Sequence, residues 1–326
     1  MNDIYVSPVD GSKLIKTVKK ADIEYLDEFG NKYKVYDGVP DFIYPRILKK
    51  EDTQAKEFYD DRADSYDDYL HLTFETFYES EDQVRNKMIS FLELKEAQIV
   101  LEVGCGTGRD SVKIIEHIGA RGKLFLQDIS LNMIIKAKQK LEDKPNIQFC
   151  VSNASHLPYP DNFFDCLYQF GGVGEFSDIK QFFTEVVRVV KKGGKVVIGD
   201  ESMPVWLRDS EFGKTLINHN PLFLTDVPLK YLPVEARDVC LRWVIGGTFF
   251  LIEFTVGEGE PDANFDFDIP GARGGTHRTR LEGQLEGVTP EAKELAHRAR
   301  EELGISMHQW LDSLVKAEAK KVLDKK

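Results

Sequence analysis

The chain has 326 residues and a formal net charge of −12, with 43 basic against 55 acidic side chains. This length accommodates one sizeable α/β domain with smaller additions. Its longest apolar runs, such as residues 249–252, are far too short to span a bilayer. An acidic chain is poorly suited to a large nucleic-acid footprint, because Lys and Arg supply most non-specific affinity for phosphates. We therefore expect a small-molecule substrate rather than nucleic acid, and no membrane span.

The four cysteines are scattered and form no C-x-x-C pair, which argues against a zinc site and against a disulfide framework. They are Cys105, Cys150, Cys166 and Cys240. Residues 1–10 lack the basic and then apolar segments of a secretory signal, so a cytoplasmic location is expected. We expect free thiols, most of them buried, and no bound metal.

The N-terminal third predicts two appendages to a main domain. Residues 1–45 predict a small β-rich cap, because Gly30-Asn31 and Asp37-Gly38 mark turns between short apolar stretches. Over residues 53–94 aromatic side chains recur at helical spacing. These residues should form helices that pack over the main domain.

The main domain is predicted over residues 46–257, where strands alternate with helices. The predicted strands are 99–103, 124–127, 147–151, 166–170 and 195–198. Such alternation predicts a parallel sheet with right-handed crossovers. Two further strands, 238–245 and 248–256, meet at Gly246-Gly247 and predict an antiparallel hairpin at one edge. The fold class is therefore α/β, with a Rossmann-like, mostly parallel sheet of seven strands.

Residues 258–326 predict a basic loop followed by a helical hairpin. Thr289 before Pro290 is a helix start, and Ser306 with Gln309 is a capping box for the last helix. We expect the hairpin to serve packing or formation of a homodimer. A DNA-reading helix-turn-helix does not suit these acidic surroundings.

The predicted strand at 99–103 runs straight into three alternate glycines, Gly104, Gly106 and Gly108. Glycine lets the backbone turn tightly and approach a ligand closely. A dinucleotide loop reads G-x-G-x-x-G, but its sixth position is Arg109 here. The spacing therefore argues against NAD.

Carboxylates surround this loop. Glu102 precedes the glycines and Asp110 follows them. A pyrophosphate would be repelled by both, whereas the sulfonium and ammonium of S-adenosylmethionine would be attracted. Asp128 ends the second strand, where an acidic residue accepts hydrogen bonds from ribose hydroxyls.

Over about residues 58–254 the sequence resembles the class I S-adenosylmethionine-dependent methyltransferases, especially the ubiquinone and menaquinone C-methyltransferases. The loop from Glu102 to Gly108 carries this resemblance, as do Asn162 to Leu167 and Val189 to Lys195. It implies methyl transfer from S-adenosylmethionine, with S-adenosylhomocysteine as product and no metal. The cofactor-binding residues that it implies are Tyr66, Glu102, Gly104, Cys105, Gly106, Gly108, Asp128, Ile129, Met133, Asn153, Ala154 and Gln169.

Two departures from related sequences stand out. Asn153 takes the place of an Asp that accepts the adenine amino proton, although an asparagine carbonyl can accept the same bond. The first 45 residues resemble a zinc-ribbon cap found ahead of some methyltransferases. Ser7-Pro8-Val9-Asp10 stands in this cap where Cys-Pro-x-Cys is expected. The resemblance therefore implies the ribbon fold without its metal.

The acceptor site should lie beyond the fourth and fifth strands, where ligands bind in open α/β sheets. Candidate catalytic residues are Glu175 after the glycine run 171–174, Glu201 after strand five, and His219 in the inserted segment 211–232. Glu175 also has a plain interpretation as a solvated loop glutamate. A base is needed only if the acceptor must lose a proton, because methyl transfer itself depends mainly on orientation.

The basic stretch 271–280 leaves two roles open. Arg273, His277 and Arg278 could bind an anionic acceptor, or they could pair with acidic residues of the chain itself. For the acceptor, an aromatic or quinone-like molecule fits the resemblance. The alternatives are methylation of an RNA base and a non-catalytic S-adenosylmethionine-binding protein.

Overall fold

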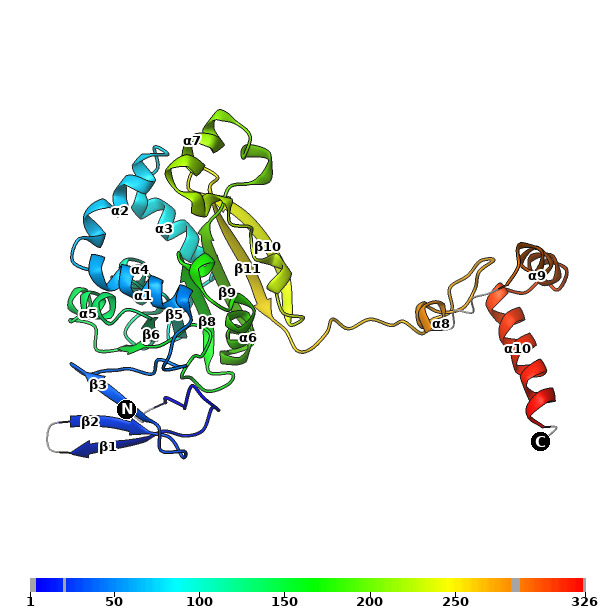
Figure 1. Cartoon of the computed structure of the whole chain (residues 1–326), viewed down its shortest axis with the longest axis horizontal. Helices are drawn as coiled ribbons and strands as arrows, with labels where there is room; N and C mark the ends of the chain where they lie inside the picture. The colour runs from blue at the N-terminus through cyan, green and yellow to red at the C-terminus, as the bar shows by residue number, and fades with distance from the viewer. Residues whose placement is uncertain (1–3, 20–21, 283–287, 325–326) are drawn as a thin grey trace. The chain divides into compact units, whose positions relative to one another are not determined.

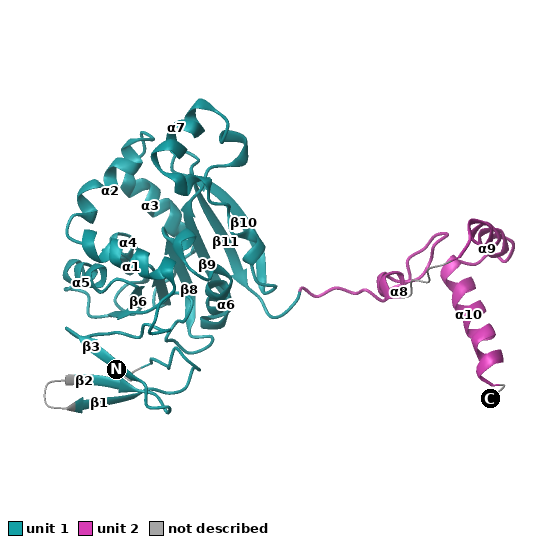
Figure 2. Ribbon diagram, viewed as in Figure 1, with its two compact units in different colours: residues 1–260 teal, residues 261–326 magenta. Residues whose placement is uncertain are grey.

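The computed structural model describes residues 4–19, 22–282 and 288–324. The chain divides into two compact units, residues 1–260 and residues 261–326 (Figure 2). The first unit contains two β-sheets with their covering helices (Figure 1). In the second unit, the described residues form three helices and the loops that connect them.

The central sheet of the first unit has seven strands in the order β10-β11-β9-β8-β5-β6-β7. Their bounds are Ile99–Val103 (β5), Lys123–Asp128 (β6), Ile147–Val151 (β7), Phe164–Phe170 (β8), Val190–Glu201 (β9), Ala236–Val244 (β10) and Phe249–Val256 (β11). The strands from β7 to β9 are parallel, whereas β11 and β10 run antiparallel at one edge. The predicted fold class and edge hairpin are confirmed.

The strand order places the site. From β5 the chain proceeds through β6 to β7 on one side, then returns to β8 and β9 on the other. The order therefore reverses between β5 and β8, and ligands of open α/β sheets bind at the carboxyl ends of the strands at such a point. Helices α4 (Arg109–Ile118), α5 (Leu131–Lys140) and α6 (Ile179–Val189) follow β5, β6 and β8.

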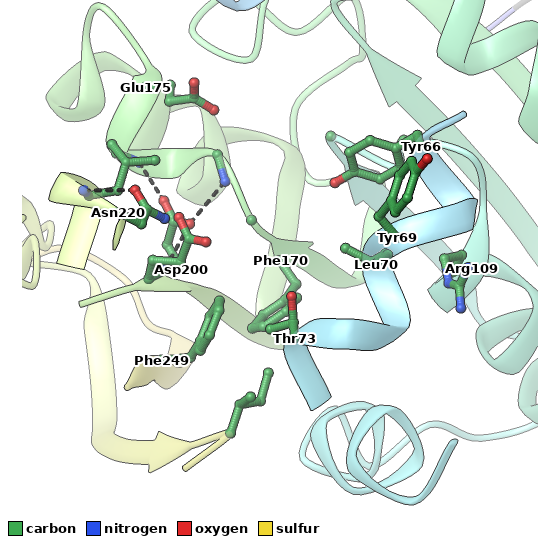
Figure 3. A pocket seen from close by; sticks show the side chains of 18 of the residues that line it. Tyr66, Tyr69, Leu70, Thr73, Arg109, Phe170, Glu175, Asp200, Asn220 and Phe249 are labelled. Atoms are coloured by element: carbon green, nitrogen blue, oxygen red, sulfur yellow. Dashed lines mark hydrogen bonds between the residues drawn. The ribbon is translucent and has the colours of Figure 1, made fainter. Parts of the chain in front are cut away.

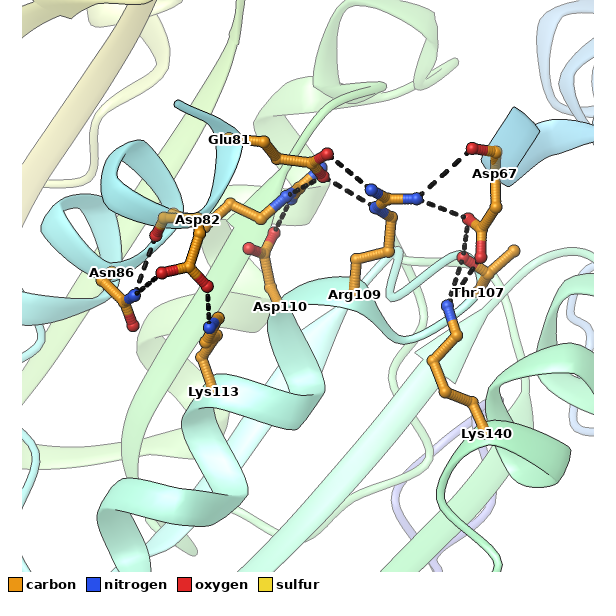
Figure 4. A network of polar contacts seen from close by, with 10 residues as sticks. Asp67, Glu81, Asp82, Asn86, Thr107, Arg109, Asp110, Lys113 and Lys140 are labelled. Atoms are coloured by element: carbon orange, nitrogen blue, oxygen red, sulfur yellow. Dashed lines mark hydrogen bonds and ion pairs between the residues drawn. The ribbon is translucent and has the colours of Figure 1, made fainter. Parts of the chain in front are cut away.

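Three helices precede the sheet: α1 (Lys50–Arg62), α2 (Tyr66–Glu75) and α3 (Glu81–Ser90). Hydrogen bonds and ion pairs connect these helices to the loops and helices that follow β5 and β6. The Ser130 hydroxyl donates to Asp60 of α1 at 2.6 Å, and the Thr107 hydroxyl donates to Asp67 of α2 at 2.6 Å. Arg109 reaches both Asp67 and Glu81 of α3 (Figure 4).

An insertion between β9 and β10 covers the same end of the sheet as α2 (Figure 1). It comprises η2 (Val205–Leu207), α7 (Glu211–His219), η3 (Pro221–Leu224) and η4 (Leu229–Tyr231). The predicted catalytic residue His219 lies in this insertion.

The N-terminal cap is an antiparallel sheet of β1 (Ile15–Lys19), β2 (Asp22–Leu26), β3 (Lys32–Tyr36) and β4 (Val39–Pro40). Its centre is a hydrogen-bonded carboxylate. Asp27 Oδ2 accepts from the Ser7 hydroxyl at 3.3 Å, from Asn31 Nδ2 at 2.7 Å and from the Tyr33 hydroxyl at 3.4 Å. Ser7, where a ribbon would have a cysteine, thus contacts the β2–β3 turn through Asp27.

The second unit contains α8 (His277–Glu282), α9 (Pro290–Glu302) and α10 (Met307–Leu323). The predicted Thr289 cap and the Ser306–Gln309 capping box are both present. The basic stretch differs from expectation, because its last four residues belong to α8 rather than to a loop. No helix in the described parts of the chain is both long and apolar enough to cross a membrane.

Candidate active site

The glycine loop after β5 forms the floor of the site. Gly104, Gly106 and Gly108 have φ angles of +66°, +52° and +80°, which side chains strongly disfavour. A Cβ on Gly106 would meet nothing within 4 Å, and one on Gly104 would meet only the Gly171 carbonyl oxygen at 3.9 Å. Both glycines line two adjoining cavities, of about 940 and about 100 Å³. Their missing side chains therefore leave room for a ligand.

Gly108 has a different role. A Cβ there would lie 3.2 Å from the Ala137 Cβ and 3.3 Å from Leu141 Cδ1, so this glycine permits close packing between α4 and α5. It caps α4 and lines neither cavity. Gly108 was predicted to bind the cofactor, but it lies outside the cavities that most of the other predicted cofactor residues line.

Asp128 at the end of β6 is fixed beside the loop. Its Oδ2 accepts from the Gly106 N–H at 2.9 Å, and its Oδ1 accepts from the Ser130 N–H at 2.9 Å. Burial raises the pKa of Asp128 to about 6, so the carboxylate is mostly ionised at neutral pH. The backbone N–H of Ile129 is a third donor to this carboxylate, which has about four lone-pair sites and so keeps one for a further donor.

The smaller cavity extends from Asp128 along the predicted adenine side. Predicted cofactor residues line it together with the glycines: Tyr66, Ile129, Met133, Asn153 and Ala154. The amide of Asn153 is oriented by two contacts: its Oδ1 accepts from the Ser155 N–H at 2.9 Å, and its Nδ2 donates to Asp52 Oδ2 at 3.1 Å. Asp52, on α1, also lines this cavity and was not singled out from the sequence.

The larger cavity begins at the acidic residues around the loop. Glu102 is buried, and burial followed by the charge of Asp110 holds its pKa well above the ordinary value. The Ser111 hydroxyl donates to Glu102 Oε2 at 2.6 Å. Arg85, which the sequence did not indicate, pairs with Asp110 at 2.8 Å and with Glu81 at 2.7 Å. Glu102, Asp110 and Arg85 all line this cavity.

Two other predicted cofactor residues are buried. The Cys105 side chain lines the larger cavity, and burial raises the pKa of its thiol well above the ordinary value. Gln169 is fully buried, and its Nε2 donates to the Gly171 carbonyl oxygen at 2.5 Å. Gln169 lines neither cavity, so it supports the 171–174 turn instead.

The larger cavity also contains three carboxylates that follow the fourth and fifth strands of the sheet, those of Glu175, Asp200 and Glu201. Asp200 accepts backbone N–H bonds from Gly172 at 3.0 Å and from Gly174 at 2.7 Å, which fixes the turn that carries Glu175 (Figure 3). Burial raises the pKa of Asp200 to about 6. Burial, then the charge of Asp200, raises the pKa of Glu201 to about 7.

All three predicted catalytic residues, Glu175, Glu201 and His219, line the larger cavity, and Glu175 lines the smaller one as well. His219 is exposed at the last turn of α7, whereas Glu201 is partly buried. The Tyr59 hydroxyl donates to Glu175 Oε2 at 2.8 Å. Burial raises the pKa of Tyr59 well above its ordinary value, so this phenol keeps its proton.

Aromatic side chains form much of the remaining wall. Burial raises the pKa of Tyr66 to about 12, and this residue lines both cavities. Figure 3 shows Tyr66 and Tyr69 facing the cavity from α2, and Phe170 with Phe249 from the sheet. The site thus combines a glycine loop and the buried carboxylate of Asp128 with a chamber of aromatic rings and acids.

Comparison with known proteins agrees with this geometry. Residues 48–210, half of the chain, match the ubiE/COQ5 methyltransferase family. A demethylmenaquinone methyltransferase of Oceanobacillus iheyensis is 33% identical over 158 residues, 44% of this chain and 66% of that protein. A ubiquinone/menaquinone biosynthesis C-methyltransferase of Francisella tularensis subsp. novicida is 33% identical over 115 residues, 34% of this chain and 46% of that protein.

These alignments span about half to two thirds of the length of the curated relatives. Among solved structures, a SAM-dependent methyltransferase from Aquifex aeolicus is similar with a TM-score of 0.42 and 22% identity. That similarity covers 64% of this chain and 100% of the other. By the family match, the chain belongs to the ubiE/COQ5 methyltransferase family of S-adenosylmethionine-dependent enzymes.

Proposed function

We propose that this protein transfers the methyl group of S-adenosylmethionine to a small molecule that carries a hydroxylated aromatic, quinone-like ring. The observation that carries the proposal is a single cavity that runs from the glycine loop to a chamber of aromatic and acidic side chains. Bound S-adenosylmethionine supplies an electrophilic methyl group on a positively charged sulfur. This acceptor class is supported by the names of the two relatives, a demethylmenaquinone methyltransferase and a ubiquinone/menaquinone biosynthesis C-methyltransferase.

The donor set of the site fits this cofactor. Gly104 and Gly106 leave open space where side chains would project. Asp128 keeps a lone pair for a ribose hydroxyl. Glu102 and Asp110 line the larger cavity beside the glycine loop. A cationic ammonium group bound there would stabilise the ionised forms of both carboxyl groups.

Glu201 is the proposed proton acceptor. A phenolic ring becomes a better nucleophile when its hydroxyl loses a proton, and a base is most effective when its pKa lies near the working pH. The pKa of Glu201, raised by burial to about 7, meets this condition. Glu175, held by Tyr59, would hydrogen-bond the acceptor, and His219 would close the rim.

The proposal is tested with purified protein, S-adenosylmethionine and a panel of substituted hydroquinones. We expect S-adenosylhomocysteine to form, and mass spectrometry with NMR to find one added methyl group on a ring carbon. The matched oxidised quinones lack the acidic hydroxyl and should not react. Binding of S-adenosylhomocysteine without turnover across a broad panel would instead favour the non-catalytic alternative.

The C-terminal helices are proposed to join two copies of the chain. None of the residues of α9 or α10 is buried, and Leu295, Leu303, Leu314 and Val315 are all exposed. Covering such apolar surface stabilises a dimer. Light scattering on the full chain should give twice the chain mass, and Leu314→Glu with Val315→Glu should give a monomer.

The four free cysteines further support a reducing, cytoplasmic location.

A further inference from the structure

Helix α1 contains an unusually placed carboxylate. Asp52 is the only residue of α1 that is buried, with 4% of its surface exposed. Burying a carboxylate is costly unless hydrogen bonds or charges compensate. The surroundings of Asp52 must therefore compensate its burial.

Three donors compensate this burial. Asp52 Oδ1 accepts from the Ser177 N–H at 3.0 Å. Its Oδ2 accepts from the Ser177 hydroxyl at 2.6 Å and from Asn153 Nδ2 at 3.1 Å. A carboxylate has about four lone-pair sites, so Oδ1 keeps one that no described residue fills. Asp52 lines the smaller cavity, where that lone pair is available to a ligand.

The side-chain oxygen and nitrogen of Asn153 each form a hydrogen bond. Its carbonyl oxygen accepts the Ser155 N–H, and its amide points at Asp52. The amide thus holds the carboxylate in place, and its second N–H remains as a donor. Together, Asp52 and Asn153 present one acceptor and one donor on the same wall of the cavity. The amino group and the neighbouring ring nitrogen of adenine require this combination.

We propose that Asp52 accepts the amino group of the cofactor's adenine, and that Asn153 positions Asp52. This inference rests on the proposed function, because it assumes that S-adenosylmethionine occupies the smaller cavity. The carboxylate that selects adenine then comes from α1 rather than from the segment after β7. Docking of α1 and binding of the base are therefore coupled.

The test compares S-adenosylhomocysteine with S-inosylhomocysteine, in which an oxygen replaces the amino group. The two are measured by calorimetry on the wild-type protein and on Asp52→Asn. The wild-type protein should prefer the amino compound by at least about tenfold, since a carboxylate attracts an amino group and repels a carbonyl oxygen. In Asp52→Asn that preference should fall to about twofold or less, mainly through weaker binding of the amino compound.

Asp60→Asn is the matched control. Asp60 is another carboxylate of α1 that fastens the helix through the Ser130 hydroxyl, but it lines neither cavity. This variant should keep the wild-type preference. Equal weakening of both compounds in Asp52→Asn would assign Asp52 to docking of α1 alone and overturn the inference. An unchanged preference would overturn it too.

A second measurement needs no variant. In a crystal structure of the wild-type protein with S-adenosylhomocysteine, the adenine amino nitrogen should lie within hydrogen-bond distance of Asp52 Oδ1. A nitrogen beyond that distance from either oxygen of Asp52 overturns the inference even if the variants do not fold. Wild-type protein that binds neither compound would contradict the proposed function itself, which separates the two failures.

Discussion

The Tyr59 hydroxyl donates a hydrogen bond to Glu175 Oε2 at 2.8 Å, although 116 positions separate the two residues. Tyr59 lies on α1 and Glu175 in the 3₁₀ turn after β8, and both line the larger and the smaller cavity. This bond therefore joins α1 to the turn after β8 at the border between the two cavities. It restricts the orientation of the Glu175 carboxylate.

Tyr59→Phe should lower kcat/KM for the acceptor about tenfold, because a hydrogen bond to a charged group contributes about 1.5–3 kcal/mol. Glu175 would then have more orientations. Tyr69→Phe is the matched control, since Tyr69 lines the larger cavity but is 66% exposed. Steady-state kinetics on both variants measures the difference. Equal losses would show that the Tyr59–Glu175 bond has no special part in turnover.

Asp128→Ala should weaken binding of S-adenosylhomocysteine by about 1.5–3 kcal/mol, since a charged acceptor for the ribose hydroxyls disappears. The Gly106 and Ser130 N–H groups would lose the same acceptor, so the loop should also become less ordered. Calorimetry on a variant whose circular dichroism matches the wild-type protein measures the effect. An unchanged dissociation constant would remove Asp128 from the site.

Local patterns in the sequence were enough to predict the sheet and the glycine loop. The strand that runs into Gly104 and Gly106 can be recognised from a few neighbouring residues. The same is true of the helix cap at Thr289 and the capping box at Ser306. Each depends on hydrogen bonds and φ angles between near neighbours. The hairpin at residues 236–256 was predictable for the same reason, because its turn is marked by two glycines.

Contacts between distant segments could not be predicted in this way. Asp52 is one of many acids in a polar stretch, and only the fold brings it beside Asn153, 101 positions away. Arg85 likewise looks like a surface residue until α3 packs against α4. Gly108 shows the converse: its position in the motif suggested a ligand contact, but packing against Ala137 accounts for its small size.

Metal analysis of the purified protein should find less than one zinc per chain. Asp27 occupies the centre of the cap, and Ser7, Asn31 and Tyr33 donate to it. Asp27→Ala leaves these donors without an acceptor and should lower the free energy of unfolding by about 1–3 kcal/mol. Chemical denaturation measures the loss, and a chelator should leave the wild-type curve unchanged. A stoichiometric metal would contradict the expected absence of zinc and the expected lack of effect of a chelator.

Arg273→Ala combined with Arg278→Ala should leave acceptor turnover near the wild-type value. Arg278 pairs with Asp266 at 2.9 Å within the C-terminal unit, which favours the second of the two roles considered for this basic stretch. Kinetics and hydrogen exchange on the full-length variant measure the two effects separately. Exchange should quicken in α8 alone. A steep fall in turnover with an unchanged affinity for cofactor would instead restore the anionic-acceptor role.

Glu201→Gln should lose most activity while the ligand-free protein becomes more stable at alkaline pH. Burial raises the pKa of Glu201 from 4.5 to about 7 in the folded state, so the folded protein binds this proton more tightly than the unfolded chain. Its ionisation therefore destabilises the fold as pH rises from about 4.5 to 7, and the cost is then constant. Glutamine never ionises, so the variant avoids this cost.

The gain from Glu201→Gln should be on the order of 1–3 kcal/mol at pH 8 and shrink toward zero near pH 4.5. Thermal unfolding at both pH values, without ligand, measures it. The wild-type kcat should rise with pH through about 7 as the base becomes ionised. Glu175→Gln provides the comparison, since it removes a neighbouring carboxylate but leaves Glu201 to titrate. If Glu201→Gln shows no pH-dependent gain and retains the wild-type pH profile, Glu201 is not the base.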